Sequence, residues 1–261
     1  MSGIEESIKK IQEFRESFEG LRTNPRLISI DGPDGAGKTS LIKEVLEKLK
    51  EKNKKENKNL EDIIYVKYID YTDTKSQKRI KELIHKENQK DEKDKDIEKI
   101  LKFWGTRLNR AYQDHIIPEL KKGKTILLDR SEVDIVRGAI EWCSENTVNK
   151  FMKYLESGTL TGGVIAGNRI FVSGSPEESW KNLKNRVLVT GHSTHNDPKS
   201  LEEMENRIKN EKKAEEIISK IRTKNEQSNI IKISNPRIEN ETEREVQIKK
   251  IAQEIIEKLR T

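Results

Sequence analysis

Short apolar runs alternate along the chain with longer stretches in which apolar residues recur every three or four positions. Each run is apolar or β-branched at nearly every residue, which is typical of strands that helices cover on both faces. The runs lie at Leu27–Ile30, Ile63–Tyr68, Thr125–Leu128, Arg169–Val172 and Ile230–Ile233. The helical stretches lie at 38–50, 75–86, 97–121, 132–156, 176–186, 200–222 and 242–259. This alternation predicts an α/β protein with three layers, in which helices flank a central parallel sheet of about five strands.

The region before the first strand carries a helical pattern of its own. Residues 4–22 have apolar side chains at helical spacing, which predicts an amphipathic helix. No later change in composition marks a boundary between two domains. We therefore expect an N-terminal helical extension over residues 1–25 and one folded domain over residues 26–261.

A glycine-rich segment joins the first predicted strand to the first predicted helix. Residues 32–39 match the phosphate-binding pattern Gly-x-x-x-x-Gly-Lys-Thr. In this pattern backbone N–H groups surround the phosphates, Lys38 reaches the β- and γ-phosphates, and the Thr39 hydroxyl binds Mg²⁺. We expect ATP to contact the whole loop, at Gly32, Asp34, Gly35, Ala36, Gly37, Lys38, Thr39 and Ser40. The loop and its context predict a P-loop NTPase fold.

A carboxylate and an arginine follow the third predicted strand. Asp129 and Arg130 come directly after Thr125–Leu128. Because parallel strands end at the edge of the sheet that carries the phosphate loop, Asp129 can reach the Mg²⁺ shell and Arg130 can meet a phosphate. The alternative is that the pair caps a helix and adds a surface cation. The neighbouring loop favours the catalytic interpretation.

Two further segments carry candidate ligand-binding residues. Phe103 and Arg107 are four residues apart, so one helical face offers a ring for stacking and a guanidinium for phosphate. The alternative is a core phenylalanine and a surface cation. A helix that begins at Pro176 is followed by the polar segment 191–198, an arrangement typical of a closing lid and also of a plain surface loop.

Composition limits the partners that we expect. Charged residues make up 38% of the chain, and no apolar run approaches the roughly 20 residues that cross a bilayer, so we expect no membrane association. The 52 basic residues are interleaved with 46 acidic ones, so we expect no specific nucleic acid. The N-terminus lacks the layout of an export signal and Cys143 is the only cysteine, which favours a cytoplasmic protein.

In combination these motifs resemble the thymidylate kinase family of nucleoside monophosphate kinases. The resemblance runs from about Leu27 to Ile221. Four elements occur in the family order, namely Asp34-Gly35-Ala36-Gly37-Lys38-Thr39, then Phe103-x-x-x-Arg107 with Ile117-Pro118-x-Leu120-x-x-Gly123, then Asp129-Arg130, and finally Pro176-Glu177 leading to Arg186. The resemblance implies a P-loop kinase domain over residues 26–261, with a lid around residues 186–200.

The resemblance also implies how an acceptor nucleotide would bind. Phe103 would stack on the acceptor base, while Arg107 and Arg130 would hold the acceptor nucleotide. Asp34 would approach the sugar, and Asp70 lies where the family usually has a carboxylate or a proline near the acceptor.

For the donor side, the resemblance implies that the lid supplies a catalytic cation. The loop has Gly35 where some members have an arginine, so this charge would come from Lys184 and Arg186, which would also contact ATP. The implied catalytic residues are Lys38, Asp129, Arg130 and Arg186. The implied Mg²⁺ ligands are Thr39 and Asp129.

The expected activity is ATP-dependent, Mg²⁺-dependent phosphoryl transfer to a nucleoside monophosphate, above all dTMP, as a step of nucleotide biosynthesis. However, the segment Ser131–Gly138 lacks the aromatic residues that the family has after its Asp-Arg pair. Two alternatives therefore stay open. One is a deoxynucleoside kinase with Asp70 as its base, and the other is a regulatory P-loop protein that binds ATP without acceptor chemistry. A homodimer is also left open.

Overall fold

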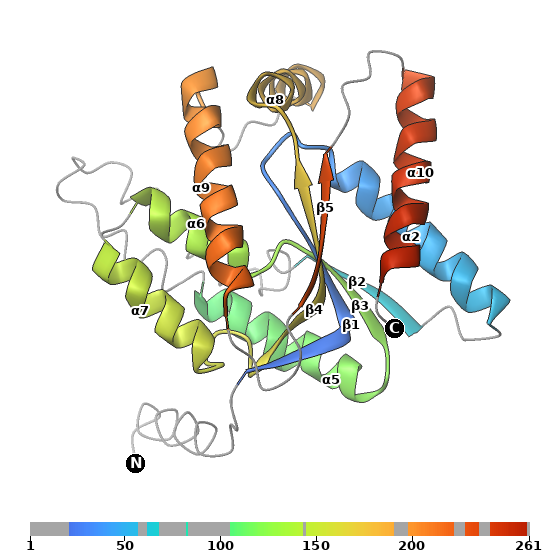
Figure 1. Ribbon diagram of the computed structural model, residues 1–261, viewed down its shortest axis with the longest axis vertical. Coiled ribbons are helices and arrows are strands. Elements are labelled where there is room, and N and C mark those ends of the chain that lie inside the picture. The colour runs from blue at the N-terminus through green and yellow to red at the C-terminus, as the bar shows by residue number, and fades with distance from the viewer. Residues whose placement is uncertain are drawn as a thin grey trace.

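A parallel sheet of five strands forms the centre of the computed structural model (Figure 1). The structure describes residues 21–56, 62–67, 82, 105–142, 145–190, 198–221, 228–234 and 241–259. The strands are β1 (Arg22–Asp31), β2 (Ile63–Lys67), β3 (Thr125–Asp129), β4 (Val164–Ser173) and β5 (Asn229–Ser234). Their order across the sheet is β2-β3-β1-β4-β5. The predicted α/β class and the parallel sheet are confirmed.

Helices cover both faces of the sheet and give three layers (Figure 1). On one face lie α2 (Lys38–Lys55) and α10 (Glu241–Lys258), and on the other lie α6 (Glu132–Trp142), α7 (Glu145–Glu156) and α9 (Leu201–Ser219). A helical stretch over residues 105–121 also packs on the second face and includes η4 (Tyr112–Ile116) and α5 (Ile117–Lys121). Another helix, α8 (Pro176–Thr190), lies near the carboxyl ends of β4 and β5.

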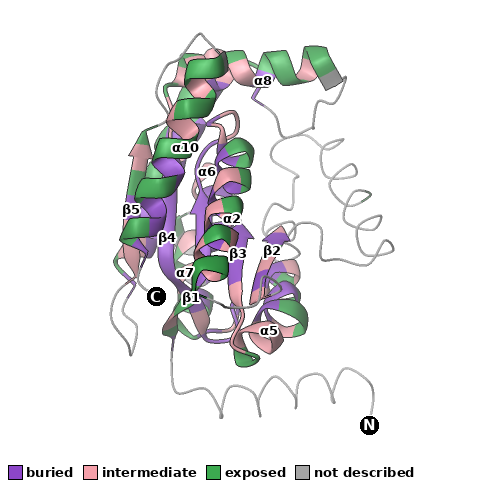
Figure 2. Cartoon of the chain, turned by 90° about the vertical axis from the view of Figure 1, so that its right-hand side faces the viewer, coloured by how far each residue is buried: buried purple, intermediate pink, exposed green. Residues whose placement is uncertain are grey.

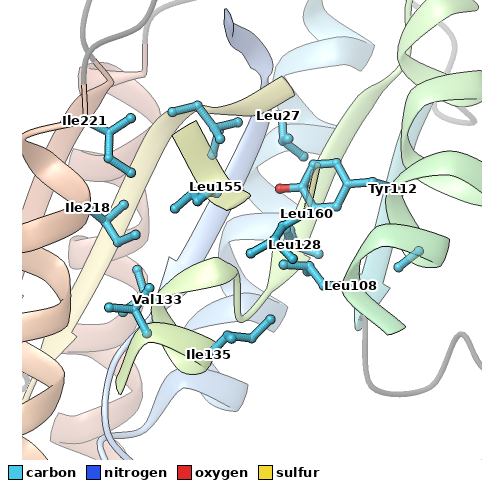
Figure 3. Close-up of a cluster of buried hydrophobic side chains, with 14 of the residues drawn as sticks. Leu27, Leu108, Tyr112, Leu128, Val133, Ile135, Leu155, Leu160, Ile218 and Ile221 are labelled. Carbon is cyan, nitrogen blue, oxygen red and sulfur yellow. The ribbon is translucent and has the colours of Figure 1, made fainter. Parts of the chain in front are cut away.

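Alternate residues of the central strands supply two separate apolar cores. Leu27 and Leu128 point to the face of α6, α7 and α9, whereas Ile28 and Leu127 point to the face of α2 and α10. Figure 3 shows the first of these cores, where Leu155 of α7 and Ile218 of α9 meet the sheet residues. Figure 2 shows the resulting burial of the strands between the helical layers. Two buried faces explain why the strands lack a polar alternation.

β1 and β4 extend well beyond the predicted apolar runs, and the reason is a local distortion that they share. β1 begins at Arg22 and includes Pro25, and its register with β4 shifts between Asn24 and Ile28. The Asn168 side chain donates to the Pro25 carbonyl at 2.7 Å. At Gly167 a Cβ atom would lie 2.6 Å from the backbone of Asn24, so only glycine allows this approach. Polar and turn-forming residues at a bulge conceal strand structure from a periodicity argument.

The helical predictions are confirmed where the structure describes them, with one correction. The pattern over residues 132–156 predicts one helix, but two helices are present, α6 and α7. Both bury their apolar faces in the same core, so the pattern continues across the break and does not reveal it. The predicted helices at 4–22 and 75–86, together with residues 97–104, lie outside the described residues except for residues 21, 22 and 82, and the helix prediction is wrong at Arg22, which is the first residue of β1. β1 begins four residues before the start of the predicted domain at residue 26.

Candidate functional site

The phosphate loop lies between the buried carboxyl end of β1 and the first turn of α2. Gly32, Gly35 and Gly37 all have positive φ angles, of 140°, 78° and 85°. At Gly32 a Cβ atom would lie 2.1 Å from the Val172 carbonyl of β4, so the loop passes close to the neighbouring strand. The loop therefore has the left-handed turns that aim backbone N–H groups at an anion, and α2 begins directly after it at Lys38.

Lys38 lies buried beneath this loop. Its side-chain Nζ donates to the carbonyls of Gly32 at 2.5 Å and Pro33 at 2.7 Å. Burial lowers the pKa of Lys38, and the carboxylates of Asp34 and Asp129 act against that change. The ammonium group is thus held against the backbone of the loop, and its contact with the β- and γ-phosphates stays a prediction.

Asp129 lies beside the loop because β3 pairs directly with β1. Ile30 and Asp129 are partners in the parallel register, so their strand ends coincide. The Asp129 Oδ2 atom accepts a hydrogen bond of 2.9 Å from the hydroxyl of Tyr65 on β2. No donor to Asp129 Oδ1 is present in the described part of the chain. Thr39 is exposed at the mouth of the loop, and the two side chains offer the hydroxyl and carboxylate oxygens that Mg²⁺ prefers.

A second aspartate, Asp31, lies at the end of β1 and was missed by the sequence analysis. Its Oδ1 accepts from the backbone N–H of Ser131 and its Oδ2 from the Ser131 hydroxyl, both at 2.8 Å. Burial raises the pKa of Asp31, and the charge of Arg169 counteracts the rise. Because both oxygens accept from Ser131, Asp31 fixes the segment after β3. Within the described ranges, no group of three or more His, Cys, Asp or Glu side chains is arranged to hold a metal.

Arg130 links the end of β3 to the phosphate loop. It has a φ angle of 68°, and its backbone N–H donates to the Ile30 carbonyl at 3.1 Å. Its guanidinium donates to Asp34 of the loop and, at 2.9 Å, to Asp134 of α6. Burial alone would raise the pKa of Asp34, but Arg130, Lys38 and other cations hold it well below its usual range. Arg130 therefore lies beside the phosphate loop with a carboxylate at its guanidinium, and its contact with a phosphate stays a prediction.

A network of ion pairs extends from Arg130 across the interface of α6 and α9. The Arg137 guanidinium lies 3.0 Å from Oδ1 of Asp134 through Nη2 and 2.6 Å from Oε2 of Glu141 through Nη1. Its Nε atom lies 3.9 Å from Oε2 of Glu211. Arg207 of α9 lies 3.8 Å from Glu141 through Nε. Burial would raise the pKa of Asp134, but Arg130 and Arg137 lower it to about 2. Burial raises the pKa of Glu211 to about 7.

The sequence analysis missed this network, although a signal for it exists. On α6 the charges of Asp134, Arg137 and Glu141 recur at helical spacing, which places them on one face. On α9 Arg207 and Glu211 are four residues apart and share the buried side of that helix. Charged residues on the buried side of two helices indicate pairing between them, but sequence alone does not say which helices meet.

The first half of α8 touches the phosphate loop, and its second half carries exposed cations. The Asn182 side chain donates to the Gly35 carbonyl at 2.9 Å. Lys184 and Arg186, the predicted lid cations, are exposed, and Lys184 lies 4.8 Å from the centre of the Trp180 ring. Their contact with ATP stays a prediction.

The predicted acceptor site is only partly described. Asp70 and Phe103 lie outside the described residues, as do residues 191–197 of the predicted lid. Arg107 is partly buried in the helical stretch over residues 105–121. The structure therefore brings Asp34 and Arg130 together, and acceptor binding at all five positions stays a prediction.

Comparison with known proteins assigns the chain to a family. The model of the KAP family P-loop domain matches residues 4–233. The chain belongs to the KAP family of P-loop domains. No curated protein matches the sequence. None of the described helices combines the length and the apolar character that a bilayer-spanning segment needs.

One solved structure supports the fold of this KAP family domain. The crystal structure of the thymidylate kinase from Ehrlichia chaffeensis superposes with a TM-score of 0.52, covering 90% of this chain and 98% of that chain at 14% sequence identity. An identity this low shows the fold alone. The P-loop NTPase fold and nucleotide binding are therefore shown, whereas membership of the thymidylate kinase family stays a prediction.

Proposed function

We propose that this KAP family domain binds Mg²⁺ and ATP and transfers the γ-phosphoryl group to water. The observation that carries the proposal is the convergence of three groups at neighbouring strand ends. They are the glycine loop with its left-handed turns, the buried Lys38 ammonium and the Asp129 carboxylate beside it. These are the parts that phosphoryl transfer requires, namely a phosphate cradle, a cation and oxygen donors for a metal.

Each residue of the nucleotide site then has a defined task. The loop from Gly32 to Ser40 would bind the triphosphate through backbone N–H groups, and Lys38 would neutralise charge on the β- and γ-phosphates. Thr39 and Asp129 would hold Mg²⁺, with Asp129 oriented by Tyr65. A bound Mg²⁺ supplies further neutralisation of the phosphate oxygens.

The proposal takes water as the acceptor because of the segment after Arg130. Ser131, Glu132, Asp134 and Arg137 are all buried there, and none of them is aromatic. The Glu132 side chain is paired with Arg169 of β4, and Asp134 and Arg137 are paired with each other. A face committed to ion pairs offers poor stacking for an acceptor base.

A second candidate, the nucleoside monophosphate kinase, is favoured by one specific contact. The resemblance assigns Asp34 to the sugar of the acceptor and Arg130 to holding the acceptor nucleotide, and the two side chains are hydrogen-bonded to each other at the mouth of the loop. In that case dTMP is the first acceptor to test, Arg107 would bind its phosphate, and Lys184 and Arg186 would assist from the lid.

The release of ADP separates these candidates. We expect steady ADP and phosphate release from ATP and Mg²⁺ alone, with no stimulation by any nucleoside monophosphate or by thymidine. Stimulation by dTMP without phosphate release would establish the kinase, and stimulation by thymidine would establish a nucleoside kinase.

Two variants complete the test. Lys38→Ala should abolish turnover in either case, because the γ-phosphate loses its cation, and a folded Lys38→Ala variant with normal turnover would overturn the site assignment. Arg107→Ala should leave hydrolysis unchanged, and a raised acceptor KM in this variant would instead support the kinase. Removal of Mg²⁺ with EDTA should stop both reactions.

A further inference from the structure

Two arginines from different elements converge on one carboxylate of the phosphate loop. Arg130, at the end of β3, donates to Asp34 Oδ1, and Arg207, on α9, donates to Asp34 Oδ2 at 3.2 Å. The Asp34 side chain is 22% exposed, so this pair of contacts lies at the mouth of the loop and not beneath it. Arg207 belongs to no sequence motif of the site.

Arg207 has donor capacity that its present contacts do not use. The side chain is only 8% exposed, and its Nε atom has no hydrogen-bond acceptor within the described part of the chain. The nearest carboxylate to Nε is Glu141, at 3.8 Å, which is beyond hydrogen-bond distance. A buried guanidinium with an unused donor is unfavourable unless another state of the protein satisfies it.

The carboxylate of Asp34 has the surroundings of a bound oxyanion. Each of its oxygens accepts from a separate guanidinium, and the charge of Lys38 also acts on it. Arginine binds carboxylate and phosphate oxygens with the same planar arrangement of donors. A phosphoryl group at the mouth of the loop would therefore find two guanidinium groups already directed at one anionic position.

We propose that Arg130 and Arg207 form a clamp for a phosphoryl group at the mouth of the loop, and that Asp34 holds the clamp in the absence of nucleotide. Arg207 would be a phosphate-binding residue contributed by α9, beyond those that the P-loop motif supplies. The inference rests on the nucleotide site of the proposed function. The phosphoryl group has two sources, the γ-phosphate of ATP or the phosphate of a monophosphate acceptor, and the binding experiment distinguishes them.

The experiment measures the Kd of three probes by calorimetry in the presence of Mg²⁺. The probes are ADP, a non-hydrolysable ATP analogue and dTMP, and the variant is Arg207→Ala. The matched control is Lys209→Ala, which removes an exposed cation from the same helix. If the clamp binds the γ-phosphate, Arg207→Ala raises the Kd of the ATP analogue by about tenfold to a hundredfold and leaves the Kd of ADP unchanged. If the clamp takes the acceptor phosphate, the loss falls on dTMP instead.

A double-variant cycle separates phosphate binding from support of the loop. Asp34→Asn should lower the Kd of the probe that Arg207→Ala affects, because it removes the carboxylate charge that competes with the phosphoryl group for the two arginines. The loss caused by Arg207→Ala should persist in the Asp34→Asn background. If that loss disappears there, Arg207 acts only through Asp34 and the clamp is refuted.

Other outcomes are equally decisive. Should Arg207→Ala not fold, Arg207→Lys keeps the charge without the planar donors and should show a smaller loss for the same probe. A folded Arg207→Ala variant with all three Kd values unchanged would refute the clamp while leaving the proposed function intact. Wild-type protein that binds neither ADP nor the analogue would refute the proposed function itself.

Discussion

Glu211 gives the most direct test of the electrostatics around the loop. The carboxyl group lies on α9, is 2% exposed, and faces Arg137 at 3.9 Å. Burial is the main cause of its raised pKa of about 7, while Arg137, Lys38 and Arg130 oppose the rise and Asp134 adds to it. The native protein therefore holds a proton on Glu211 at a pH where the unfolded chain has lost it.

This difference predicts how stability changes with pH. Between the unfolded pKa of 4.5 and the native pKa of about 7 the unfolded state binds fewer protons, so the contribution of Glu211 to stability falls as pH rises through that interval. Above the native pKa the penalty is complete, and a pKa difference of this size corresponds to about 3 kcal/mol. Glu211→Gln keeps the shape of the protonated form and removes the penalty. We expect the variant to be more stable than wild type by about 3 kcal/mol at about pH 8, and by less than about 1 kcal/mol at about pH 5.

Urea unfolding at the two pH values measures this difference. Glu205→Gln is the control, since Glu205 is exposed on the same helix and should show no pH-dependent gain. If Glu211→Gln follows wild type at both pH values, the carboxyl does not titrate as the structure indicates. If the variant is less stable than wild type at about pH 8, Glu211 is ionised and its attraction to Arg137 outweighs burial.

Three further predictions concern the metal, the buried charges and the loop. Tyr65→Phe removes the hydroxyl that orients Asp129 and should raise the Mg²⁺ concentration for half-maximal turnover by about tenfold or more, whereas an unchanged Mg²⁺ dependence would argue against Asp129 as a ligand. Arg169→Met leaves the fully buried Glu132 without its partner and should lower the free energy of unfolding by about 3 to 5 kcal/mol in urea; a loss below about 1 kcal/mol would show that the pair does not matter. Gly35→Ala places a Cβ atom 2.2 Å from the backbone of α8 and should abolish ATP binding in a protein that still melts cooperatively, so normal ATP affinity in this variant would refute the contact between α8 and the loop.

Much of the fold could be predicted from local pattern. All five strands lie where apolar runs occur, because a strand covered on both faces must be apolar along its length. The parallel arrangement follows from the intervening helices. The strand ends were predicted less well, since β1 continues through Pro25 only because a bulge and Gly167 of β4 accommodate it. A sequence pattern does not predict a strand at a proline, and Pro25 is accommodated only because of how β1 pairs with β4.

The candidate site was likewise predictable only in part from the sequence. The phosphate loop is a local structure, so its glycines, Lys38 and Thr39 could be identified from spacing alone, and Asp129 could be placed by the rule that parallel strands end together. The partners of these residues could not be identified. Asp31 belongs to the same strand as the loop, yet its engagement by Ser131 depends on how β3 pairs with β1.

The sequence by itself determined the elements, the phosphate cradle and the identity of the groups that can carry charge, because these depend on residues close together in the chain. The tertiary structure decided which charges meet. Arg207 lies 173 positions from Asp34, and no periodicity relates them. They meet because α9 packs on α6 over one face of the sheet, and burial there makes each charge depend on a partner that only the fold supplies.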